Sequence, residues 1–278
     1  MGSKASKPKR PTPTKPKTII IPIIPHDIIN EILDNLATDS DFRSIRACAL
    51  VSKSWVEPCQ FHLFHTVLFV PWNVYKWLEL FRVRERSPAH HVRDLHVRIG
   101  VGEALPDRIY EHLSWFTNVD RIEFSGGGGY PLGSRWDLLA REPSLWKLST
   151  SVTSLTINTN VVTLVHVRDI MAQMPNLDDL GLLGPFAETD RRKLPGIGTV
   201  LKGRFGGRLM LRDADEDVVN MLLEIPSGLH FVELEIYCTH SRLPPWAVRF
   251  TEACGKTLVK LSHTASYNCK SYHFSYSG

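Results

Sequence analysis

The chain has 278 residues, of which 43% are hydrophobic, 9% aromatic and 22% charged, a composition typical of globular proteins. Its formal net charge of +4 is misleading, because residues 1–17 hold six Lys or Arg and no acid. The rest of the chain has 27 basic and 29 acidic residues, a net charge of −2, which excludes a basic nucleic-acid-binding domain. Five cysteines without a Cys-x-x-Cys pair are typical of a reducing, intracellular compartment.

Residues 1–21 form a basic, proline-rich tail. The first seventeen residues contain four prolines and no large apolar side chain after Met1. Such a segment cannot bury enough apolar surface to offset the entropy lost on ordering, so we expect it to be disordered. The opening Met1–Ser6 also matches the N-myristoylation pattern, in which Gly2 becomes the acylated residue.

The sequence leaves two roles open for this tail. A single myristoyl chain binds a bilayer only marginally, at about 10⁴ M⁻¹, so a stable anchor needs a second signal. Lys4, Lys7, Lys9 and Arg10 would supply one, at about 1 kcal/mol for each base near an anionic membrane surface. The same basic run is also typical of a nuclear localisation signal. We therefore expect a cytoplasmic protein, with membrane association through Gly2 or nuclear import as the alternatives.

The longest apolar run near the start, Thr18–Pro25, predicts neither a signal peptide nor a transmembrane helix. It is short, Pro22 interrupts it, and polar residues follow it instead of a small-residue cleavage site. No stretch of the chain approaches the roughly 20 apolar residues needed to span a bilayer.

Residues 24–36, IPHDIINEILDNL, predict the first helix. Their apolar residues recur at helical spacing and form one broad stripe, and Pro25 suits the first helical position. A second helix should begin after Asp41, whose side chain can cap it, and should bury Phe42 and Ile45. Such stripes usually lie in a core, so part of the first one must be core.

The order of these residues resembles the F-box motif, which usually reads Leu-Pro-x-Glu-Ile, then Ile-Leu, Leu, Val-Ser/Cys-Lys-x-Trp and Leu-Phe. The matching residues are Ile24 to Ile28, Ile32, Leu33, Leu36, Leu50 to Trp55, Leu63, Phe64 and Val67. Two departures are conservative, Ile24 in place of Leu and Asp27 in place of Glu. The resemblance covers residues 22–70, fewer than fifty of the 278.

The resemblance implies a three-helix module that docks on the Skp-type adaptor of a cullin-based SCF ubiquitin ligase. Size supports a docking role, because so small a unit can hardly complete a core alone and its stripe is too wide to cover without a partner. The expected adaptor-binding residues are Ile24, Pro25, Ile28, Ile29, Ile32, Leu33, Leu36, Leu50, Val51 and Trp55.

Short strand-like pieces recur along residues 71–278. Their central apolar residues, 25 to 33 positions apart, are Leu95, Ile122, Leu155, Leu180, Leu209, Leu234 and Leu261. Leucine-rich repeats have a similar period of roughly 20–29 residues. Helix-like stretches lie between several pieces, at residues 107–116, 164–174, 215–225 and 244–254. This alternation predicts parallel strands with the helices on one face.

The layout resembles that of many fungal F-box proteins, in which a degenerate repeat domain follows the F-box. It departs from the standard leucine-rich repeat, because only Asn160 occupies the Asn/Cys position after a strand and Gly206 replaces an expected apolar residue. The predicted fold class is therefore α+α/β, with a small three-helix F-box followed by an irregular leucine-rich-repeat-like α/β solenoid.

The sequence holds no motif that argues for catalysis, a cofactor or a metal. Gly255-Lys256-Thr257 lacks the earlier glycine of a phosphate-binding loop, since Phe250 stands at that position. Cys59, His62 and His65 have no fourth zinc ligand at a known spacing. We therefore predict that the chain is not an enzyme and binds neither cofactor nor metal.

The sequence thus predicts a substrate receptor of an SCF-type ligase. The F-box would hold the adaptor and cullin ligase, and the repeat domain would hold a client protein whose identity the sequence does not specify; no nucleic acid is expected as a partner. The alternative is a scaffold outside any ligase, tethered to a membrane by its tail, whose F-box-like helices only cap the repeats.

Overall fold

The computed structural model describes residues 24–99, 108–126, 150–159, 162–186, 200–238, 243–265 and 270–275. The predicted tail of residues 1–21, with the acylation candidate Gly2 and its four nearby bases, lies outside these ranges. Asn160, the one residue that fits the Asn/Cys position of a standard repeat, also lies outside them.

Three helices begin the described chain, namely α1 (His26–Thr38), α2 (Phe42–Cys48) and α3 (Lys53–Phe64). Pro25 immediately precedes α1, where its missing N–H costs no helical hydrogen bond. The Asp41 carboxylate caps α2 as predicted, since Oδ1 accepts the Ser44 backbone N–H at 3.1 Å. The helices enclose their own apolar cluster of Ile29, Leu33, Ile45, Trp55 and Cys59.

Within the described ranges, one sheet of nine strands follows, and its strands are ordered as they occur in the chain. Strands β1 to β8 are parallel, and β9 pairs antiparallel with β8. Their bounds are β1 (Thr66–Phe69), β2 (Asp94–Ile99), β3 (Arg121–Gly126), β4 (Ser154–Thr159), β5 (Asp179–Leu183), β6 (Arg208–Arg212), β7 (Glu233–Cys238), β8 (Lys260–Ala265) and β9 (Lys270–Ser275). The parallel sheet confirms the α/β class.

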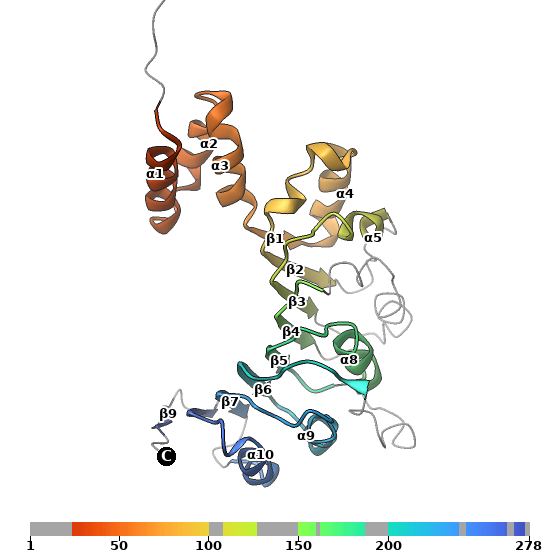
Figure 1. The fold of residues 1–278 in the computed structure, drawn as a ribbon. Helices are drawn as coiled ribbons and strands as arrows, with labels where there is room; N and C mark the ends of the chain where they lie inside the picture. Colours follow the sequence, from red (N-terminus) through yellow and green to blue (C-terminus); the bar gives the residue numbers. More distant parts are fainter. Residues whose placement is uncertain are drawn as a thin grey trace, which may run out of the picture.

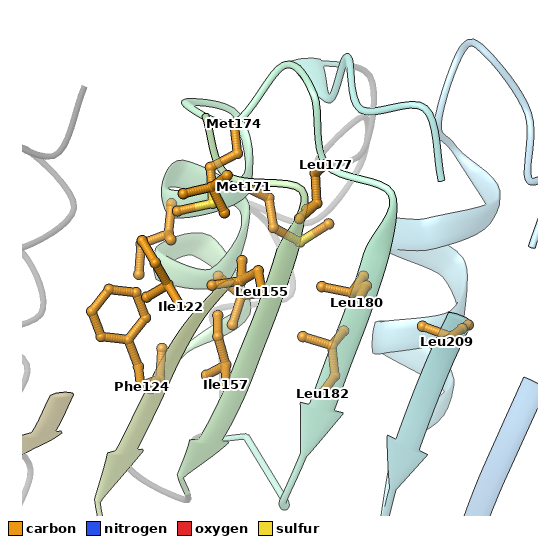
Figure 2. Packing of buried hydrophobic residues seen from close by; sticks show 14 of the residues in the cluster. Ile122, Phe124, Leu155, Ile157, Met171, Met174, Leu177, Leu180, Leu182 and Leu209 are labelled. Atoms are coloured by element: carbon orange, nitrogen blue, oxygen red, sulfur yellow. The ribbon is translucent and has the colours of Figure 1, made fainter. Parts of the chain in front are cut away.

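The predicted central apolar residues form one continuous row across the sheet. Leu95 is in register with Ile122, and the row continues strand by strand to Leu261. Leu155 and Leu180, at the middle of the row, are both fully buried. Figure 2 shows these leucines pointing toward the helix side of the sheet, where the methionines of α8 and its following turn cover them.

Helices connect the strands and lie along one side of the sheet (Figure 1). They are α4 (Pro71–Leu80), α5 (Arg108–Leu113), α8 (Leu164–Met171), α9 (Glu216–Leu223) and α10 (Trp246–Cys254), with short 3₁₀ helices η1 (Arg84–Arg86) and η2 (Pro88–His91) before β2. Four of these helices lie within the stretches that the sequence predicted, and α4 was not predicted.

The sheet begins earlier in the chain than the repeat pattern indicated. Strand β1 lies inside residues 22–70, the range that the sequence analysis assigned to the F-box, and Val67 extends the apolar row by one strand. A second apolar cluster, separate from that of α1–α3, runs from Val67 on β1 to Cys254 on α10. Only His65 separates α3 from β1, so the three helices continue directly into the sheet.

Candidate protein-docking surfaces

Helix α1 carries two apolar stripes side by side. One contains Ile29 and Leu33, which are 1% and 0% exposed and face α2 and α3. The other contains Ile28 and Ile32, which are 45% and 38% exposed. Ile24, which is 43% exposed, lies two residues before the helix begins. Because residues four apart share a helix face, each stripe is continuous along the helix axis. The broad stripe seen in the sequence is therefore half core and half surface.

The structure divides the expected adaptor-binding residues into three groups. The exposed ones are Ile24, Pro25, Ile28, Ile32, Leu50 and Val51, and Leu36 is half-buried. Ile29, Leu33 and Trp55 are buried. These three side chains build the small core on which the exposed residues rest, and a partner cannot reach them in this arrangement.

The turn between α2 and α3 exposes two further apolar side chains. Leu50 and Val51 are 88% and 67% exposed, while their backbone N–H groups donate to the carbonyls of Ala47 and Cys48 at 3.1 and 3.0 Å. The turn is thus fixed by its backbone hydrogen bonds and presents both side chains to solvent. Large apolar groups held outward in this way commonly mark a contact surface.

Two aromatic residues of the helical module were not predicted to be exposed. Phe42 was expected in the core, but it is 44% exposed, because Ile45 occupies the inward position on α2. Phe61 is 39% exposed, and its ring meets those of His65 and His91 edge-on at 5.8 and 6.4 Å. Phe61 therefore lies at the junction between α3 and the sheet.

The three residues considered as zinc ligands have separate environments. Cys59 is fully buried, and burial raises the pKa of its thiol to about 11. The His62 Nε2 lies 3.3 Å from the Asp34 carboxylate on α1, whereas the His65 Nδ1 lies 3.7 Å from Asp94 on β2. Within the described ranges, no group of three or more His, Cys, Asp or Glu side chains is arranged to hold a metal ion.

The face of the sheet opposite the helices is polar and carries two clusters of ion pairs. Side chains alternate between faces along a strand, so residues flanking the apolar row lie on this open face. At the β2–β3 end, the Arg121 Nη2 donates to Asp94 at 2.8 Å and the His96 Nδ1 lies 3.0 Å from Glu123. Both pairs bridge neighbouring strands, as cross-strand pairs of opposite charge do.

The second cluster lies on β6, β7 and β8. Glu235 accepts from the Arg208 Nη2 at 2.6 Å and from the Tyr237 hydroxyl at 2.9 Å, and Lys260 lies 3.3 Å from Glu233. Burial alone would raise the pKa of Glu235, but the two hydrogen bonds and the neighbouring positive charges outweigh it, so that pKa lies below its ordinary value.

A short row of uncharged residues lies on the strands between the two clusters. It contains Thr156 on β4, Gly181 on β5 and Met210 on β6, which are in register with one another. A Cβ on Gly181 would lie 2.9 Å from the Thr156 hydroxyl oxygen and 3.1 Å from the Met210 methyl group. The two neighbouring side chains therefore close over the glycine. The open face thus carries two clusters of ion pairs with these three uncharged residues between them.

Neither protein-family models nor curated proteins gave a match to this chain when they were searched. Across the part of the chain that the structure describes, no helix has both the length and the apolar character needed to cross a membrane.

Proposed function

We propose that the protein is an F-box substrate receptor of an SCF-type cullin ubiquitin ligase. The exposed stripe of Ile28 and Ile32 on α1, together with exposed Ile24 just before the helix, is the observation that carries this proposal. The module already has its own core, so these isoleucines are not needed to hold the three helices together. An apolar helix face left over after the core is complete suits insertion into the groove of a partner.

The adaptor-binding surface in this proposal consists of the exposed stripe together with Leu50 and Val51. The match to the F-box pattern supports it, because the exposed residues belong to the motif and its buried residues, such as Trp55, build the core beneath them. The motif residues thus fall into a contact set and a supporting set.

The repeat-like α/β part, for which we propose a degenerate leucine-rich-repeat solenoid, would hold the client protein. Its open face, with two clusters of ion pairs and a short row of uncharged residues between them, offers side chains for specific recognition. The receptor would act by bringing the client beside a charged ubiquitin-conjugating enzyme. Catalysis would come from proximity, and no side chain of this chain would take part in bond-making.

Paired substitutions on α1 test the adaptor proposal. Ile28→Asp with Ile32→Asp places two charges on the exposed stripe and should abolish co-elution with a Skp-type adaptor in size-exclusion chromatography. The fold should survive, because both positions are already exposed. Asn30→Asp adds one negative charge to an exposed position off the stripe and should leave co-elution unchanged. Wild-type co-elution of a folded double variant would overturn the proposal.

A scaffold outside any ligase remains the second candidate, with the three helices serving only to cap the sheet. It is favoured by the direct packing of α3 against the first strand–helix unit, where Phe64 meets Trp77 and Phe81 edge-on at 6.2 and 6.1 Å. This candidate predicts that the wild-type protein fails to co-elute with the adaptor, and that removal of α1–α3 destabilises the sheet.

A further inference from the structure

Helix α4 carries large aromatic residues on the side that faces away from the core. Its inward side chains Val74 and Trp77 are 0% and 8% exposed. On the outward side, Trp72 and Tyr75 are 74% and 62% exposed, and Leu80 at the end of the helix is 63% exposed. The outward side of a surface helix is ordinarily charged or polar, so these aromatic residues require a cause other than folding.

Basic residues accompany the exposed aromatic residues. Between Pro71 and Ser87 the chain holds four basic residues (Lys76, Arg82, Arg84 and Arg86) and two acids, a net charge of +2. Lys76 lies on the same helix face as Trp72, four residues on. The Arg82 Nε donates to the Glu79 carbonyl at 3.2 Å, which holds Arg82 at the end of the helix. None of the four bases forms an ion pair with a described residue.

The position of α4 leaves this face accessible at one end of the row of helices. Figure 1 shows α4 beside β1, at the end of the sheet from which α1–α3 extend, with α5 next to it. The outward surface of α4 and the segment Arg82–Arg86 that follows it is named here the α4 face. It consists of Trp72, Tyr75, Lys76, Glu79, Leu80, Arg82, Val83, Arg84, Glu85 and Arg86, and its two acids leave it with a net charge of +2.

We propose that the α4 face binds the surface of an anionic lipid membrane. Trp and Tyr prefer the headgroup level of a bilayer, because there the apolar ring contacts lipid while its N–H or O–H group contacts water. Arg and Lys side chains beside them are attracted to anionic lipids, and each base raises the affinity for such a membrane about fivefold. The positive charge of the α4 face complements that surface.

Size favours a lipid surface over a protein partner. Trp, Tyr and Arg are also common at protein interfaces, but a stable interface buries about 800 Å² on each partner. Helix α4 has ten residues and is about 15 Å long, so its outward face alone is small for such an interface. A bilayer needs no matching partner surface, and weak contact here would add to any other membrane contact of the chain.

Vesicle sedimentation of the full-length chain, made without any acyl group, tests this proposal and does not depend on the ligase. Phosphatidylcholine vesicles with about one third phosphatidylserine are compared with pure phosphatidylcholine vesicles. Trp72→Ser with Tyr75→Ser should lower partitioning to the anionic vesicles at least tenfold. Val248→Ser is the control, because Val248 is 61% exposed on α10 at the other end of the sheet.

Charge is tested separately with a matched pair. Arg84→Gln with Arg86→Gln removes two bases and should lower anionic-vesicle binding about 25-fold and weaken its dependence on salt. Lys202→Gln with Arg204→Gln removes the same charge from exposed positions away from α4 and should change binding less than about twofold. All variants should keep the wild-type thermal midpoint, since every substituted side chain is exposed.

Quenching by brominated phosphatidylcholine gives a second measurement. If Trp72 enters the lipid interface, Trp72→Phe should remove most of the vesicle-dependent fluorescence quenching and leave binding nearly unchanged. The proposal is overturned if the Trp72→Ser/Tyr75→Ser protein binds anionic vesicles as the wild type does. It is also overturned if the α4-face substitutions abolish binding to an acidic protein and leave vesicle binding intact, since the face would then dock a protein.

Discussion

Leu180→Ala should be among the most destabilising single substitutions in the sheet. The side chain is fully buried and lies in register between Leu155 on β4 and Leu209 on β6. Truncation of a buried leucine to alanine lowers the free energy of unfolding by about 2–5 kcal/mol, because the transfer free energy of the removed atoms is lost and a cavity is left behind. Met171 and Met174 belong to the same cluster, and their flexible side chains can partly fill the space. We therefore expect about 3 kcal/mol.

Chemical denaturation and calorimetry measure this loss. For a chain of this size, about 3 kcal/mol corresponds to a fall in thermal midpoint of about 6–12 °C. Leu261→Ala is the matched control, because Leu261 occupies the same row on β8 and is only partly buried. Leu261→Ala should therefore lower the free energy of unfolding clearly less than Leu180→Ala does. A loss below about 1 kcal/mol at Leu180, or an equal loss at Leu261, would refute the assignment of this row as the centre of the core.

Two further predictions concern titratable groups. Cys59 and Cys254 are buried, and burial raises the pKa of each thiol to about 11. In the folded protein at pH 8, both should therefore resist iodoacetamide, whereas half-buried Cys48 should react first. Peptide mass spectrometry measures the labelling, and equal labelling of all three cysteines would contradict the prediction. The pKa of Glu235 is lowered by its hydrogen bonds, so its ionised form stabilises the fold at neutral pH, and this contribution is lost as pH falls below about 4.5. Glu235→Gln should therefore be less stable than wild type at pH 7. The difference in unfolding midpoint between the two proteins should become smaller as the pH is lowered through the acid range. A difference that stays constant with pH would show that packing, not charge, is responsible.

The sequence alone determined where most secondary structure lies. The apolar residues of the row from Leu95 to Leu261 stand in short strand-like pieces that recur 25 to 33 positions apart, and such a repeat predicts one strand for each piece. Asp41 could likewise be identified as a helix cap, because capping depends on a few neighbouring residues. Features of this kind are local, and local sequence is sufficient to predict them.

Strand β1 and helix α4 escaped prediction because their signals are weak in isolation. Residues 66–69 contain only four strand residues, and they follow α3 so closely that they read as the end of the helical module. Trp72 and Tyr75 on the outward side of α4 obscure its polar face, so its helical period is not evident in the sequence.

Tertiary structure decided which apolar residues are core and which are surface. Ile28 and Ile29 are identical in type and adjacent in sequence, yet one is 45% exposed and the other 1%. Hydrophobicity can be read from sequence, but which stripe of a helix is buried depends on where α2 and α3 pack, and that is fixed only when all three helices assemble. The same holds for Arg208 and Glu235, which are 27 residues apart and become partners only because β6 and β7 are adjacent and place them diagonally across from each other.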